Sequence, residues 1–310
     1  MVYGMPEASS DLSETDLVDD LERAIQAGEL RLYYQPQVSL VDNRTVGVEA
    51  LIRWEHPQRG LLLPGQFMPS AEVAGLGRRI TKFVLPQAIA ALVRWAHAGW
   101  GISVSVNLAP QDLTDSHIVD LVSQQVVRLP VPRHRLILEI TEHSAISDIK
   151  HASDTLATWR RAGVRTSLDD FGTGYSSLSY LAVLALDEIK LDRAFLVANR
   201  DTDGYLLRSA VEIGHHLGLR VVGEGAETLA DVETLRSAGV EVIQGFWFSR
   251  AVPRRQIASS YVGGCTEPGC TEPGWPEVTA RENDGLRSVR PERRLSLQAA
   301  PVLPRPPSSQ

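Results

Sequence analysis

The sequence has little cysteine, no excess of basic residues and no long apolar run, and each shortage excludes a class of protein. Its two cysteines, Cys265 and Cys270, lie in the tandem repeat CTEPGCTEPG, so we expect neither a disulfide framework nor a cysteine-based metal site. The 31 Lys and Arg against 38 Asp and Glu leave a net charge of −7. This balance disfavours a protein that binds a DNA or RNA polymer through many phosphate contacts. An anionic substrate would therefore need metal cations.

The apolar segments are too short to cross a bilayer. The longest, Phe83 to Val93, contains Pro86 and Gln87 and is far shorter than the roughly 20 residues that a membrane-spanning helix needs. The opening MVYGMPEASSDLSE has no basic region followed by an apolar core, so it does not resemble an export signal. We expect no membrane span and a cytoplasmic location.

Strand-like runs and helical patterns alternate along most of the chain. For example, Ile149, Ala152, Leu156 and Trp159 recur at helical spacing, and Gly163 follows them as an end signal. Strands that alternate with helices indicate a mostly parallel sheet. The predicted strands are Leu30 to Val38, Thr45 to Arg53, Ile102 to Asn107, Leu136 to Ile140, Val164 to Asp169, Glu188 to Leu191, Arg220 to Glu224 and Val240 to Gln244.

The first connection differs from the others. The segment LVDNRT is too short for a crossover helix and contains the turn residues Asp42 and Asn43, so the first two strands should be antiparallel. The pattern therefore predicts an α/β fold, a TIM-like (β/α)8 barrel with a reversed first strand, preceded by a helix that ends at Gly28. An open doubly wound sheet is the alternative.

Composition divides the chain into three parts. Residues 13–262 carry the periodic patterns of one catalytic-sized domain, and residues 1–12 are expected to be disordered. Residues 263–310 are rich in Pro, Gly, Ser, Arg and Glu, and they contain too little apolar surface to offset the entropy of ordering. We expect this tail to be disordered.

Polar side chains recur at or near the ends of the predicted strands, where a barrel brings them to one face. Alone, each has an ordinary explanation: Lys190 could pair with Asp192, and Asn107 could be a turn residue. Together, the carboxylates would repel one another unless cations neutralise them, and oxygen ligands of this number suit two Mg²⁺ or Mn²⁺ ions. The residues are Glu49, Asn107, Glu139, Asp169, Asp170, Lys190, Glu224 and Gln244.

A set of longer strings resembles the EAL domain family. These strings occur in the order and spacing of that family and cover about Ser13 to Ser260. They are Gln35-Pro36, EALIRW from Glu49, VNL from Val106, LEITE from Leu138, DDFGTGYSSL from Asp169, IKLD from Ile189, GEGAET from Gly223 and QGFWFS from Gln244. The family's phrase more usually has Ala and Val where Gly223 and Ala226 stand, which leaves Glu224 in place.

The resemblance implies an enzyme that hydrolyses cyclic di-GMP to linear 5′-pGpG with two Mg²⁺ or Mn²⁺ ions. Glu49, Asn107, Glu139 and Asp169 would hold one ion, and Asp169, Asp170 and Glu224 the other. Lys190 and Glu224 would act on the attacking water. By the same resemblance, Gln35, Arg53 and Gln244 would bind substrate or its water network, and Glu142 would steady the loop that begins at Asp170.

The resemblance also implies a homodimer, and it leaves two alternatives to an active enzyme. One is a receptor that binds cyclic di-GMP without hydrolysing it. Against this, every position that the chemistry needs holds a suitable residue, and a pure binder has no use for a full two-metal set. The other is a scaffold that binds proteins through the proline-rich LPRPP, which does not exclude activity.

The tail composition yields a direct prediction. A chain that ends near Gly263 should keep its fold and its activity, because nothing beyond that residue is apolar enough to join the core. Thermal unfolding of the full and shortened chains tests this. A large drop in Tm after shortening would mean that the tail docks on the domain.

Overall fold

The computed structural model describes residues 14–142, 148–172, 178–199 and 204–257. The chain divides into two compact units, Met1–Pro276 and Glu277–Gln310, and every described residue belongs to the first. The predicted disordered ends and both cysteines lie outside the described residues, so the expectations for them stay predictions. No helix among the described residues combines the length and apolar character needed to cross a membrane.

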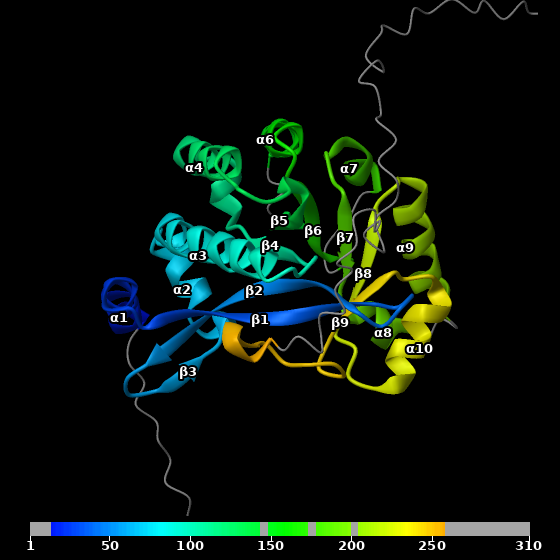
Figure 1. Cartoon of the computed structure of the whole chain (residues 1–310), viewed down its shortest axis with the longest axis horizontal. Helices are drawn as coiled ribbons and strands as arrows, with labels where there is room; N and C mark the ends of the chain where they lie inside the picture. Colours follow the sequence, from blue (N-terminus) through cyan, green and yellow to red (C-terminus); the bar gives the residue numbers. More distant parts are fainter. Residues whose placement is uncertain (1–13, 143–147, 173–177, 200–203, 258–310) are drawn as a thin grey trace, which may run out of the picture. The chain divides into compact units, whose positions relative to one another are not determined.

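In the described part of the chain, eight of the ten strands form a closed ring. Figure 1 labels the strands of this ring. β1 pairs antiparallel with both β2 and β9, and the other neighbours in the ring pair parallel. The predicted barrel with a reversed first strand is confirmed, and the open sheet is excluded because β1 joins its two ends. In ring order the strands are β1 (Leu30–Ser39), β2 (Thr45–His56), β4 (Ser103–Asn107), β5 (Leu136–Thr141), β6 (Arg165–Phe171), β7 (Glu188–Leu191), β8 (Arg220–Glu224) and β9 (Val242–Gln244).

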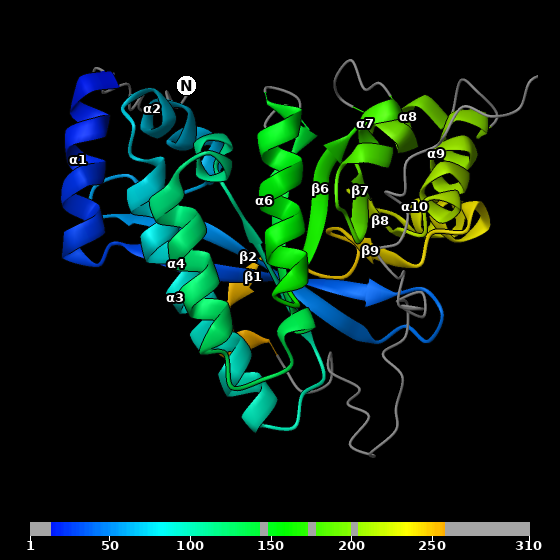
Figure 2. The same ribbon diagram turned by 90° about the horizontal axis from the view of Figure 1, so that it is seen from above.

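Helices lie outside the strands, as Figure 2 shows for α3, α4 and α6. The Thr228 side chain caps α10 by accepting a hydrogen bond from Asp231 N, and Gly239 ends that helix with φ 90°. The α-helices are α1 (Glu14–Ala27), α2 (Met68–Val73), α3 (Gly77–His97), α4 (Ser116–Val127), α6 (Ile149–Arg161), α7 (Leu178–Val183), α8 (Ala194–Asn199), α9 (Tyr205–His216) and α10 (Leu229–Ala238). Short 3₁₀ helices are η1 (Pro64–Gln66), η2 (Pro110–Leu113), η3 (Arg133–Arg135) and η4 (Arg254–Gln256).

Two short strands extend the ring beyond the prediction. β3 (Gly60–Leu62) pairs with the end of β2, and β10 (Val252–Pro253) pairs with β1. Strands of two or three residues carry no detectable periodicity, so the sequence could not predict them. Because β2 continues to His56 to pair with β3, Glu49 lies in the middle of its strand, and its predicted place near the strand end is wrong.

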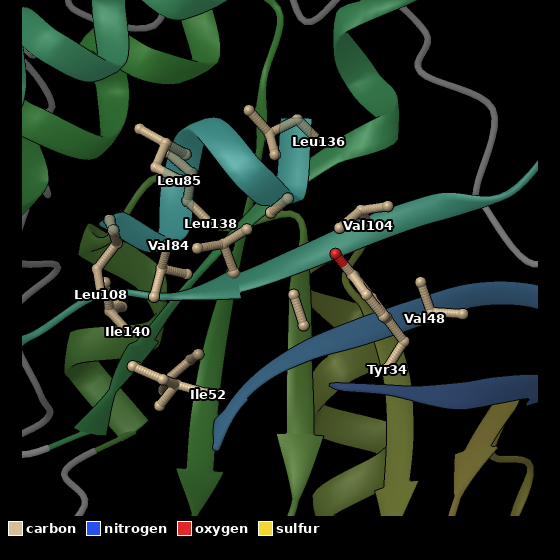
Figure 3. Close-up of a cluster of buried hydrophobic side chains, with 14 of the residues drawn as sticks. Tyr34, Val48, Ile52, Val84, Leu85, Val104, Leu108, Leu136, Leu138 and Ile140 are labelled. Atoms are coloured by element: carbon tan, nitrogen blue, oxygen red, sulfur yellow. The ribbon is translucent and has the colours of Figure 1, made fainter. Parts of the chain in front are cut away.

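The apolar core lies between the outer face of the ring and the helices. Alternate residues of the strands point outward, and several of them meet Val84 and Leu85 of α3 (Figure 3). The residues between them point into the barrel and are largely polar. The barrel therefore has an apolar exterior covered by helices and a polar interior. Outward residues in this cluster include Val48, Ile52, Val104, Leu136, Leu138 and Ile140.

A buried ion pair joins β7 and β8 where both strands begin. Arg220 Nε donates to Glu188 Oε2 at 2.6 Å, and both residues have 0% exposed surface. The two residues are direct register partners, so neighbouring strands bring the opposite charges together. Removing one member of such a pair costs far more than replacing both, because the other charge stays buried.

We therefore expect Glu188→Ala to lower the free energy of unfolding by about 3–5 kcal/mol. Glu22→Ala is the control, because Glu22 pairs with Arg79 at 2.8 Å while their side chains are 50% and 36% exposed. Glu22→Ala should lower the free energy of unfolding much less. Urea unfolding of both variants measures the difference, and equal losses would contradict the assigned role of the buried pair.

Candidate functional site

Four carboxylates from four strands surround one ammonium group inside the barrel. Lys190 Nζ on β7 lies 3.4 Å from Glu49 Oε2 on β2 and 3.1 Å from Glu139 Oε2 on β5. It also lies 3.0 Å from Asp169 Oδ1 on β6 and 2.8 Å from Glu224 Oε1 on β8. The Lys190 side chain is only 1% exposed. The predicted convergence of these polar side chains is therefore a feature of the structure.

Side-chain amides hold the carboxylate of Glu49 from two sides. Asn107 Nδ2 donates to Glu49 Oε1 and Gln244 Nε2 donates to Glu49 Oε2, each at 2.5 Å. Gln244 Nε2 also lies 3.3 Å from Gln35 Oε1, and Gln35 Nε2 donates to Ser249 O at 3.2 Å. These bonds fix the orientation of Glu49 and link β1, β2, β4 and β9 at the site.

The carboxylates form two overlapping groups that could each hold a metal ion. Glu49, Glu139 and Asp169 place one oxygen each within 4.8 Å of the others, and so do Asp169, Asp170 and Glu224. Asp169 belongs to both groups and could bridge two ions. The structure thus brings together the carboxylates of the two predicted ligand sets, and Asn107 lies beside the first through Glu49.

Asp169 and Asp170 share one side of β6 because the strand carries a β-bulge. Between the partners Leu168↔Ile189 and Phe171↔Leu191, β6 has two residues where β7 has only Lys190. Consecutive residues of a regular strand point to opposite faces, whereas a bulge lets two residues oppose one. The sequence predicts both aspartates as ligands but gives no sign of the bulge that makes this possible.

Burial and charge move the pKa values of the carboxylates in different directions. Burial raises the pKa of Glu139 well above its ordinary value, and it raises that of Glu224 to about 8, although Lys190 opposes both shifts. Burial also raises the pKa of Glu49, but the Lys190 charge and the amides of Gln244 and Asn107 outweigh it, so the net pKa is lowered. Asp169 has a raised pKa, chiefly from burial.

The ammonium group of Lys190 stays protonated despite its burial. Burial lowers the pKa of Lys190, but Asp169, Glu139, Glu224 and Glu49 together raise it well above the ordinary value. At neutral pH the group is therefore a fixed positive charge and a hydrogen-bond donor. It is not available as a base.

The donor set fits hard divalent cations such as Mg²⁺ or Mn²⁺. All ligand candidates offer oxygen, and Glu139 Oε1 is buried without a hydrogen-bond partner among the described residues. A buried carboxylate oxygen without a partner is costly, and a metal ion would satisfy it.

The remaining predicted residues lie around this centre. Arg53 is half-buried on β2, four residues beyond Glu49, and its Nη1 donates to Ile52 O at 2.9 Å. Glu142 Oε2 accepts a hydrogen bond from Gly172 N at 3.2 Å, and its role in steadying the loop stays a prediction. Residues 173–177 of the loop lie outside the described residues.

The alternative interpretation of Lys190 as the partner of Asp192 does not describe its main contacts. Lys190 pairs with four carboxylates across the barrel, while Asp192 Oδ1 accepts a hydrogen bond from Ala194 N at 2.7 Å.

The packing of α10 explains why glycine stands at residue 223, because a Cβ at this residue would lie 2.7 Å from Leu235 Cδ2. Leu235 of α10 fills the space that the Cβ of a larger residue would occupy.

If the carboxylates bind metal, Mn²⁺ should stabilise the fold. A free Mn²⁺ concentration of about 100 times Kd should add about 2.7 kcal/mol. Glu139→Gln should remove the share of this gain that comes from the ion beside Glu49 and Asp169, because it deletes a buried ligand of that ion, whereas Glu233→Gln on the exposed face of α10 should keep the whole gain. Thermal unfolding with Mn²⁺ and with a chelator tests the site. An equal shift in Glu139→Gln would place the metal elsewhere.

Comparison with known proteins agrees with the geometry. A family model described as EAL domain matches residues 18–251. MucR of Pseudomonas aeruginosa, named a bifunctional diguanylate cyclase/cyclic di-GMP phosphodiesterase, is 40% identical over 252 residues, which are 80% of this chain and 36% of MucR. An uncharacterized protein of Mycobacterium tuberculosis is 37% identical over 242 residues, 77% of this chain and 39% of that protein. The chain thus spans less than half the length of these curated relatives.

Solved structures give the same assignment. The PaMucR phosphodiesterase in complex with c-di-GMP is 40% identical with a TM-score of 0.74, over 78% of this chain and 100% of that chain. The EAL enzyme Bd1971, in its form bound to cAMP and cyclic di-GMP, is 27% identical with a TM-score of 0.73, over 80% of this chain and 69% of that chain. The sequence resemblance is confirmed, and the chain belongs to the EAL domain family.

Proposed function

We propose that this protein hydrolyses cyclic di-GMP to linear 5′-pGpG. A water oxygen would bond to one phosphorus, the bond from that phosphorus to the ribose O3′ would break, and a proton would pass to the leaving O3′. The observation that carries the proposal is the buried Lys190 among Glu49, Glu139, Asp169 and Glu224, with all the predicted ligand residues present around it. The name of MucR and the complex of PaMucR support the choice of substrate.

Two divalent ions would be held by the two overlapping carboxylate groups. Glu49, Asn107, Glu139 and Asp169 would hold the first, and Asp169, Asp170 and Glu224 the second. Bound there, such ions supply an activated water and charge neutralisation at the phosphate.

Lys190 would act as a fixed cation and not as a base. Its pKa lies well above the ordinary value because of the four carboxylates, so it keeps its proton at neutral pH. Its Nζ could therefore orient the attacking water by donating a hydrogen bond, and its charge would stabilise the negative charge that grows on the phosphoryl oxygens. Such help is strongest in the transition state.

Glu224 is the better placed proton acceptor. Its side chain is 18% exposed, against 0% for Glu139, so it lies on the open side of the cluster. Without metal, burial raises its pKa to about 8, and nearby cations would lower that value and leave a carboxylate able to accept a proton.

The remaining residues would position substrate. Arg53 carries a positive charge on the same inner face of β2 as Glu49 and suits a phosphate oxygen. Gln35 and Gln244 form a hydrogen-bonded pair beside Glu49 and could bind substrate or its ordered water. The homodimer and the cytoplasmic location stay predictions.

Incubation of the purified protein with cyclic di-GMP and Mg²⁺ or Mn²⁺, followed by separation of the products, tests the function. We expect linear pGpG to accumulate. Binding of the dinucleotide without product would instead identify a receptor.

Ca²⁺ should inhibit the hydrolysis of cyclic di-GMP, because it prefers more ligands and longer distances than this arrangement suits.

Two substitutions should separate chemistry from metal binding. Lys190→Ala should lower kcat by about 10²- to 10³-fold while the affinity for cyclic di-GMP changes little, because it removes a transition-state interaction. Glu49→Ala should abolish turnover and also weaken metal binding, because it deletes an anchored ligand. Initial rates with Mn²⁺, together with calorimetric binding of cyclic di-GMP in Ca²⁺, give both quantities.

The exposed Lys82→Ala on α3 serves as the control for loss of a lysine and should keep normal rates. Near-normal turnover by Lys190→Ala would show that the buried ammonium serves only to hold the carboxylates together.

A further inference from the structure

The bulge in β6 is held in an unusual backbone conformation at Asp170. Asp170 has φ 56°, which is in the left-handed region that residues with a side chain seldom adopt. It is one of two such residues other than glycine in the part of the chain that the structure describes, the other being Asn43 in a turn. A strained residue inside a strand persists only where its surroundings enforce it.

The bulge decides which side of β6 each side chain occupies. In a regular strand, Asp170 would point to the same side as Leu168, toward the helices, and Phe171 would point into the barrel. The extra residue reverses this. Asp170 joins the group formed with Asp169 and Glu224, while Phe171 pairs with Leu191 and is 4% exposed in the apolar layer.

An aromatic contact lies directly behind the bulge. Phe195, near the start of α8, stacks on Phe171 with the ring centroids 6.2 Å apart and an angle of 16° between the planes. The edge of the same ring fills the space where a Cβ of Gly172 would lie, so no side chain fits at residue 172 while Phe195 keeps this position. Gly172 itself has φ 97°. The Phe195 ring thus contacts both residues that follow Asp170.

We propose that Phe195 is a positioning residue that holds the Asp169-Asp170 bulge and thereby the second metal site. This proposed role of Phe195 rests on the proposed two-ion function. If the ring were removed, Phe171 could leave its outward position and Asp170 could relax to an ordinary strand conformation. Its carboxylate would then turn away from Asp169 and Glu224, and the group formed by Glu49, Glu139 and Asp169 would remain.

This role differs from that of an ordinary core residue. Loss of packing alone would lower Tm and affect both ion sites alike. Loss of the bulge would weaken one ion selectively, because Asp170 belongs to only one of the two carboxylate groups. A split between the two ions is therefore the signature of the positioning role.

The test is calorimetric titration of the full chain with Mn²⁺ alone, comparing wild type with Phe195→Leu. We expect wild type to bind two ions. Phe195→Leu should lose about 10- to 100-fold in affinity for one of them, as is typical for residues that orient metal ligands, and should bind the other as before. Gly172→Ala, whose Cβ would press on the edge of the same ring, should reproduce the split if Phe195→Leu folds poorly.

Two comparisons make the assignment specific. Phe83→Leu, at a partly buried phenylalanine on α3, should lower Tm without weakening the affinity for one Mn²⁺ ion more than for the other. Asp170→Asn tolerates the left-handed conformation but lacks the charge, so adding Phe195→Leu to it should weaken the second ion little further.

The outcomes separate this proposal from the proposed function. Unchanged Mn²⁺ affinities in Phe195→Leu, equal losses at both ions, additive effects with Asp170→Asn, or a single ion in wild type would each overturn the positioning role. Wild type that binds two ions but yields no pGpG would overturn the hydrolase, while a selective loss in Phe195→Leu would still support the role of Phe195.

Discussion

The ammonium group of Lys190 is the charge on which the interior of this barrel depends. Four carboxylates point at it from β2, β5, β6 and β8, and its own side chain is 1% exposed. Placing several carboxylates together in a protein interior is costly unless cations and hydrogen bonds compensate. Lys190 supplies the central cation, and the amides of Asn107 and Gln244 compensate Glu49, which alone among the four has a lowered pKa.

The alternation of the strands makes such an interior possible. Outward residues such as Val104 and Leu138 pack against helices and stabilise the ring, so inward residues are free to be polar. Where the strands begin, the buried charges of Glu188 and Arg220 neutralise each other. Toward the strand ends, the ammonium group of Lys190 neutralises the carboxylates. The polar groups therefore divide into a closed structural pair at one end and a more accessible carboxylate cluster at the other, where the chemistry is proposed.

Much of this arrangement could be predicted from the sequence because it follows from periodicity. The eight ring strands, the reversed first strand and the convergence of Glu139, Lys190 and Glu224 all follow from strand-like runs, a short connection and polar residues at recurring places. The β-bulge could not be predicted, because the string DDFG does not reveal that two consecutive aspartates lie on the same side of the strand. Nor could the contact of Phe195 with Gly172, because the start of α8 and the residue after β6 are brought together only by the fold.

The most direct test of the account is a crystal structure grown with Mn²⁺ and cyclic di-GMP under conditions that block turnover, with the metal located by anomalous scattering. The account predicts two peaks that share Asp169: one beside Glu49, Asn107 and Glu139, the other beside Asp170 and Glu224. The phosphate that is to be cleaved should lie against both. A single peak, peaks away from these carboxylates, or a dinucleotide bound remote from Lys190 would contradict it.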